Sequence, residues 1–141
     1  MLGITYWNLD KQDLAISEYK TSLEHNPYFA PSRNNLANIY AHLGKTDLAI
    51  EEYQKAILSD PAYEKTYYNL AALYHRRGDL DQAIKYYSEA IRVNPRYELA
   101  HLNLGKAYSA KGLEEKAREE WRKVLELNPD NQEAMKLLQG R

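Results

Sequence analysis

Residues 61–95 read PAYEKTYYNLAALYHRRGDLDQAIKYYSEAIRVNP, and this stretch decides the fold. It runs between two prolines, Pro61 and Pro95, and each follows an Asp or Asn, a pair that signals a turn. In between, Leu70 and Tyr74 are one helical turn apart, and further apolar positions follow at the same spacing. Gly78 permits the tight turn that ends one helix and leads into the next. The stretch therefore predicts a helix, a short turn and a second helix.

The pattern recurs along the chain at a fixed interval, because Pro27, Pro61, Pro95 and Pro129 are evenly spaced. The aligned positions are Leu2, Leu36, Leu70 and Leu104; Tyr6, Tyr40, Tyr74 and Tyr108; Ala15, Ala49, Ala83 and Ala117; Tyr19, Tyr53, Tyr87 and Trp121; and Leu23, Ile57, Ile91 and Leu125. This register predicts inner helices near 1–8, 31–43, 65–77 and 99–111, outer helices near 13–25, 47–59, 81–93 and 115–127, and a final helix near 131–139.

Leu-Gly/Ala-x-x-Tyr, then Gly, then Ala-x-x-x-Tyr/Trp, then Pro, repeated at this interval, resembles the tetratricopeptide repeat, whose period is about 34 residues. The resemblance implies an all-α fold, a right-handed α-solenoid (superhelix) of helix-turn-helix units, in which stacking neighbours bury the apolar stripe that one pair cannot bury alone. We expect one domain, 1–141: a truncated first repeat at 1–29, complete repeats at 30–63 and 64–97, a fourth at 98–129 and a C-terminal capping helix at 130–141. The truncated first repeat suggests either a piece excised from a longer chain or a start codon inside an array.

Composition excludes several functions. The 141 residues carry 19 Lys and Arg against 20 Asp and Glu, so a strongly basic nucleic-acid binder is not expected. The sequence has no Cys, which rules out disulfides and thiolate metal sites. The longest stretch without a charged residue, 34–44, is too short to span a bilayer, and no basic segment precedes an apolar run at the N-terminus. We expect a cytoplasmic protein without membrane insertion.

Catalytic and metal-binding patterns are not found. The sequence contains no Walker-type loop, dinucleotide fingerprint or nucleophile elbow, and its four His never pair at helical ligand spacing. The acidic pairs on the outer helices, such as Glu51 with Glu52 and Glu119 with Glu120, are expected on solvated faces with partners such as Glu51–Lys55. We predict no enzymatic activity, no cofactor and no metal.

The remaining candidate is the surface of the inner helices, which lines the concave side in tetratricopeptide arrays. Its non-anchor positions in the three later inner helices include no Asp or Glu, which predicts a mildly basic groove, to which His42 and His75 can add charge below about pH 6.5. We expect it to bind an extended, neutral-to-acidic peptide segment of a partner protein. The candidate peptide-binding residues are Asn34, Asn35, Asn38, His42, Lys65, Tyr68, Asn69, His75, Arg76, Asn103 and Lys106.

Asn35, Asn69 and Asn103 form a column with one amide per repeat. A carboxamide both donates and accepts hydrogen bonds, so the column could hold a peptide backbone. It resembles the asparagine ladder of the repeat domain in protein O-GlcNAc transferases, which implies binding of extended substrates by their backbone. The alternative is that Asn only caps or spaces neighbouring inner helices.

A second resemblance is to the carboxylate clamp that binds chaperone tails. Asn38 and Asn69 match it, but Asn34, Leu99 and Asn103 replace its Lys, Lys and Arg, so most of the charge needed for carboxylate capture is missing. Two other functions stay open: weak self-association through an apolar end formed by Leu2, Ile4, Tyr6 and Trp7, and substrate recruitment as a segment of a larger glycosyltransferase.

Overall fold

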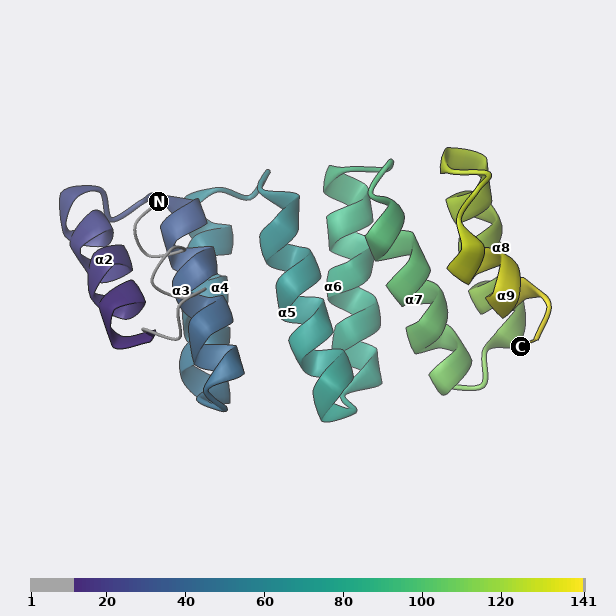
Figure 1. Cartoon of the computed structure of the whole chain (residues 1–141), viewed down its shortest axis with the longest axis horizontal. Helices are drawn as coiled ribbons and strands as arrows, with labels where there is room; N and C mark the ends of the chain where they lie inside the picture. Colours follow the sequence, from purple (N-terminus) through teal and green to yellow (C-terminus); the bar gives the residue numbers. More distant parts are fainter. Residues whose placement is uncertain (1–11, 141) are drawn as a thin grey trace. The chain divides into compact units, whose positions relative to one another are not determined.

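The protein is all-α in the part that the structure, a computed structural model, describes, which is residues 12–140 (Figure 1). Each observed helix agrees with its predicted span to within one residue at either end, while the predicted helix near 1–8 lies outside the described residues. The helices are α2 (Gln12–His25), α3 (Ala30–His42), α4 (Thr46–Ser59), α5 (Glu64–Arg77), α6 (Leu80–Val93), α7 (Glu98–Ala110), α8 (Glu114–Leu127) and α9 (Gln132–Leu138).

The chain divides into two compact units, which we call unit 1 (Met1–Thr66) and unit 2 (Tyr67–Arg141). In unit 1, α3 packs against both α2 and α4, and the buried residues include Leu36, Ala37 and Tyr53. In unit 2, consecutive helices from α6 to α9 pack against one another. Each unit therefore buries the apolar stripes of its helices by pairing them, as the repeat pattern predicts.

The turns follow directly from the Asn/Asp-Pro dipeptides. In all four, the side-chain Oδ1 of Asn26, Asp60, Asn94 or Asn128 accepts a hydrogen bond from the backbone N–H two residues later, at 3.0–3.2 Å. The shorter turn within a repeat uses glycine in a left-handed conformation, with φ of 85° at Gly78. The predicted turn positions are thus confirmed.

The aromatic columns pack against small residues on neighbouring helices. In unit 2, Tyr87 forms a buried cluster with Ala71, Ala83, Leu104 and Ala107. In the fourth repeat the aromatic is the larger Trp121, and the small residue beside it is Gly105, where an added Cβ would come within 2.3 Å of the indole Nε1. The indole nitrogen donates a hydrogen bond to the carbonyl oxygen of Leu102 at 3.2 Å.

Helix α9 covers the end of unit 2. Its Ala134 is buried in a cluster with Leu102, Trp121 and Val124, and Leu137 and Leu138 pack against that cluster. The Asn131 side chain caps the helix by accepting from the Ala134 N–H at 2.8 Å. This arrangement holds α9 in a defined position and brings its first turn close to α7.

None of the helices within residues 12–140 combines the length and the apolar character that a membrane span requires.

Candidate functional site

A set of partly exposed polar side chains connects the inner helices of unit 2. We call it the inner-helix face and define it as Tyr68 and His75 on α5, Asn103 and Lys106 on α7, and Glu133 on α9. Asn103 Nδ2 donates to the Tyr68 hydroxyl at 3.1 Å, and Lys106 Nζ forms an ion pair with Glu133. Side-chain contacts therefore join all three helices along this face.

Aromatic rings support the α5 side of this face. The Tyr68 ring lies 5.2 Å from the Tyr97 ring and 5.7 Å from the Tyr87 ring, measured between centroids. Tyr87 is buried, and its hydroxyl lies 3.5 Å from His75 Nδ1 with the two rings edge-on. Because these rings pack against one another, Tyr68 and His75 are held in fixed positions.

Burial changes the protonation of these groups. Burial and the nearby Lys106 charge lower the pKa of His75, and burial and the Glu133 carboxylate raise the pKa of Tyr68. The sequence predicted that His75 would add positive charge below its ordinary value of about 6.5. The structure corrects this expectation, because the imidazole stays neutral to a lower pH.

The ladder amides have intramolecular partners. Both hydrogens of Asn103 Nδ2 are engaged, one by the Tyr68 hydroxyl and one by the Leu99 carbonyl at 2.9 Å, so Asn103 has its acceptor Oδ1 to offer a ligand. Asn35, which belongs to unit 1, hydrogen-bonds the Tyr19 side chain. Asn69 lies on α5 in unit 2 and is partly exposed.

The face is less basic than the sequence predicted. The register places Glu133 in the same column as Pro31, Lys65 and Leu99, and the structure confirms that this acid reaches Lys106. The predicted absence of acids holds for the three later inner helices, but α9 both caps unit 2 and adds a carboxylate to this face.

The other predicted residues have mixed placements. Asn34 is buried, with 3% of its surface exposed, so the expectation that it lines an open groove is wrong. The Asn38 Oδ1 accepts a hydrogen bond from the Tyr53 hydroxyl. His42, Lys65 and Arg76 are exposed. Asn35, Asn38, His42 and Lys65 belong to unit 1, whereas Tyr68, Asn69, His75, Arg76, Asn103 and Lys106 belong to unit 2.

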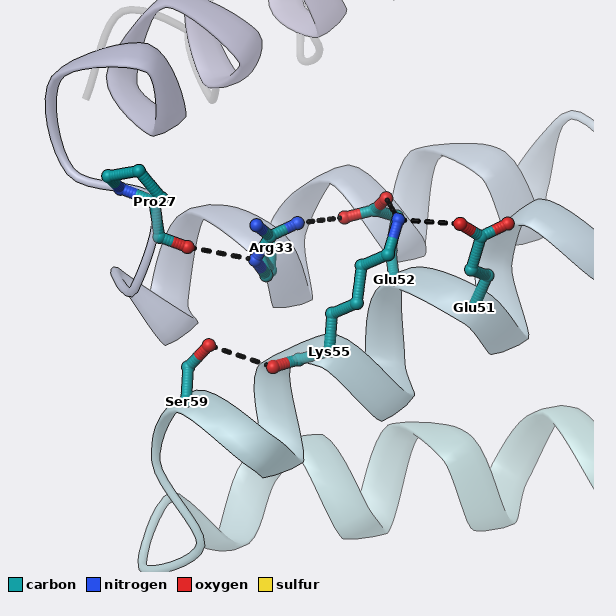
Figure 2. Close-up of polar contacts among 6 residues, drawn as sticks. All are labelled: Pro27, Arg33, Glu51, Glu52, Lys55 and Ser59. Atoms are coloured by element: carbon teal, nitrogen blue, oxygen red, sulfur yellow. Dashed lines mark hydrogen bonds and ion pairs between the residues drawn. The ribbon is translucent and has the colours of Figure 1, made fainter.

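A charged cluster in unit 1 joins the turn before α3 to α4 (Figure 2). Arg33 donates from Nε to the Pro27 carbonyl at 3.1 Å and from Nη1 to Glu52 at 2.9 Å. Lys55 pairs with the other Glu52 oxygen at 3.2 Å and with Glu51 at 2.5 Å, which confirms the expected Glu51–Lys55 pair. We call these residues the Arg33 cluster.

The same geometry recurs two repeats later, in unit 2. His101 Nε2 lies 2.9 Å from the Pro95 carbonyl, and Nδ1 lies 2.6 Å from Glu120. Lys123 pairs with the other Glu120 oxygen at 2.8 Å. We call these residues the His101 cluster. Glu120 is buried, so its expected place on a solvated face is wrong.

The protonation of His101 follows from its two partners. Because a carbonyl oxygen and a carboxylate both accept hydrogen bonds, this arrangement favours the protonated imidazole, in which both ring nitrogens donate. Burial disfavours that charge, but the hydrogen bonds to Glu120 and Pro95 outweigh it and raise the pKa of His101. Burial likewise opposes ionisation of Glu120, yet His101 and Lys123 lower its pKa.

Neither cluster is among the predictions made above from the sequence, although the sequence carries a signal for both. Arg33 and His101 occupy the same position of their repeats, three residues before the aligned Leu36 and Leu104. The glutamates and lysines of the two clusters also stand at matching positions of the outer helices. In both clusters the glutamate of the outer helix pairs with the cation of the inner helix, which links the two helices of the repeat. Across residues 12–140, no three His, Asp or Glu side chains gather as a metal ion requires.

Comparisons with known proteins agree with the repeat register. The chain matches family models described as TPR repeat over residues 37–78 and 73–112, and as tetratricopeptide repeat over residues 1–29, 18–51 and 98–131. A search of curated proteins finds no match.

Solved structures share the fold. MamA is 26% identical with a TM-score of 0.86, covering 98% of this chain and 81% of MamA. The first TPR of Spaghetti (RPAP3), bound to the HSP90 peptide SRMEEVD, is 32% identical with a TM-score of 0.74, covering 79% of this chain and 88% of that one. PilF of Pseudomonas aeruginosa, 24% identical with a TM-score of 0.88 over 97% of this chain and 63% of its own, shares the fold alone.

Proposed function

Because the chain belongs to the tetratricopeptide repeat family, we propose that it is a non-catalytic scaffold that binds an extended segment of a partner protein on the inner-helix face. The observation that carries this proposal is the row of partly exposed polar groups from Tyr68 through Asn103 to Lys106, fixed by contacts between helices.

The chemistry of the row suits a peptide. The Asn103 Oδ1 can accept a backbone N–H, which contributes about 0.5–1.5 kcal/mol per bond. Lys106 and the exposed Arg76 favour carboxylates, although exposed ion pairs contribute only about 0–1 kcal/mol each. These groups favour a neutral-to-acidic peptide. Because each contact is weak, the expected affinity is of roughly micromolar order.

Asn69 and Asn103, the two ladder amides of unit 2, are part of the same proposal, and Asn35 is proposed as a peptide contact within unit 1. Stacked helices pack about 8–10 Å apart and an extended chain advances about 3.3 Å per residue, so successive ladder amides would meet a peptide at roughly every third residue. The partner peptide of the RPAP3 domain, SRMEEVD, is itself short and acidic, which supports a ligand of this class.

An array of extended heptapeptides, read with the full chain, tests the proposal. Asn69→Ala with Asn103→Ala should weaken binding to all bound peptides by about three- to tenfold, because each lost backbone contact affects every sequence alike. Gln82→Ala, which truncates an exposed amide on α6, is the matched control and should change nothing. Absence of any bound peptide, or equal effects of the two sets of variants, would contradict the proposal.

A further inference from the structure

Helix α9 contributes an acid to a face that is otherwise neutral to basic. Glu133 lies in the first turn of α9, and its carboxylate pairs with Lys106 on α7. The cap formed by Asn131 and the packing of Ala134 against Trp121 hold this turn in place. The backbone of Glu133 is therefore held by the fold and does not depend on the ion pair.

The pair also lies among the other groups of the inner-helix face. Lys106 is close enough to His75, and Glu133 close enough to Tyr68, to affect the protonation of those side chains. Tyr68 in turn accepts from Asn103. An acidic side chain of a bound peptide that reached Lys106 would approach an ammonium group that the Glu133 carboxylate already contacts.

The geometry points to Glu133 as an internal competitor for acidic ligands: its carboxylate pairs with Lys106 in the free protein and competes there with a carboxylate of the partner. This inference rests on the proposed peptide binding and specifies how that site selects its partner. The exchange is feasible, because the Lys106 and Glu133 side chains are 34% and 54% exposed and a pair of this kind is weak.

The consequence concerns selectivity more than affinity. With Glu133 present, a peptide carboxylate replaces one ion pair with another, so the free energy gained is small. Without it, Lys106 would gain a partner on binding and the local field would be more positive. Removing Glu133 should therefore increase the affinity for acidic peptides relative to neutral ones by about two- to fivefold, the range expected for one exposed ion pair.

The test uses the full chain and the same heptapeptide array, with peptides that carry from none to three acidic residues. Glu133→Gln should raise the ratio of acidic to neutral binding by about two- to fivefold at low salt, and less at physiological salt. Glu89→Gln is the matched control, because it removes the same charge from an exposed ion pair on α6, away from this face. It should leave the ratio unchanged.

Lys106→Met separates a specific exchange from a general field effect. In that background Glu133→Gln should no longer alter the ratio. An equal response to Glu133→Gln and Glu89→Gln, or a Glu133→Gln effect that persists without Lys106, would overturn the inference while the proposed function stands. If neither the parent chain nor any variant binds a peptide, the proposed function fails and the competitor role fails with it.

Discussion

The Arg33 cluster in unit 1 and the His101 cluster in unit 2 solve one structural problem with different chemistry. In both, the side chain of an inner-helix residue connects the carbonyl of the preceding proline to a glutamate on the outer helix. A lysine pairs with the other oxygen of that glutamate. The Arg33–Glu52 side chains are 19% and 14% exposed, whereas those of His101 and Glu120 are 6% and 11% exposed. The cation of the link is therefore always charged in the second repeat, where it is an arginine. In the fourth repeat it is a titratable histidine, and the link is more deeply buried.

The largest difference should follow removal of the glutamates. Glu120→Ala leaves a buried imidazole without its acceptor and should lower the free energy of unfolding by about 3–5 kcal/mol. Glu52→Ala leaves a partly solvated guanidinium and should cost about 1–2 kcal/mol, between the exposed and buried limits. Urea denaturation followed by helical circular dichroism measures both. Equal losses would show that burial does not distinguish the two clusters.

The aromatic packing of the two repeats differs as well, since Ala37 and Tyr53 occupy the positions that Gly105 and Trp121 hold in the fourth. Gly105→Ala should destabilise by about 1–3 kcal/mol, because the added methyl overlaps the buried indole. Adding Trp121→Tyr, which recreates the pair of the second repeat, should recover part of that loss. A stabilising Gly105→Ala, as helix propensity alone would give, would contradict this packing.

A smaller effect should depend on pH. Because the folded pKa of His101 is raised, its stabilisation is complete below the ordinary imidazole value of about 6.5 and is lost as pH rises through the folded pKa. The lowered pKa of Glu120 acts at the acid end, where stability falls as pH drops through its folded value. Denaturation across pH should show both limbs.

Exchanging histidine and arginine between the two clusters tests the loss of stability at higher pH separately from the loss at low pH. His101→Arg keeps a charge at neutral pH, as Arg33 does, and should remove the loss of stability above about pH 6.5. Arg33→His should introduce such a loss. The opposite contribution of His75, whose pKa is lowered, cancels in these differences. A parent chain and a His101→Arg variant with parallel pH profiles would show that His101 does not titrate in this range.

The smallest effect should be common to both clusters. Lys55 and Lys123 are 43% and 39% exposed, so either substitution by Ala should cost only about 0–1 kcal/mol. Lys20→Ala, which truncates an exposed lysine on α2, serves as the control and should stay within about 0.5 kcal/mol of the parent chain. A loss well beyond that of an exposed pair, for one lysine alone, would mean that its cluster depends on three charges rather than two.

The repeat fold could be predicted because its signals are local. An Asn/Asp-Pro turn, a glycine in a left-handed turn and an aromatic matched to a small residue each act over a few positions, and the register repeats them. The arrangement of the candidate site was harder to predict from the sequence, because it depends on how the helices pack. The burial of Asn34, the orientation of Asn103 by Tyr68 and the approach of Glu133 to Lys106 are set by neighbouring helices rather than by spacing.

The most direct test of the proposed scaffold is an NMR titration of the full chain with the tightest peptide from the array. The side-chain signals of Tyr68, Asn103 and Lys106 should shift and saturate at roughly micromolar peptide, while those of Gln82 and Lys85 on the outer helix α6 should not move. Shifts confined to the outer helices, or no shift on the inner-helix face with any peptide, would contradict the account.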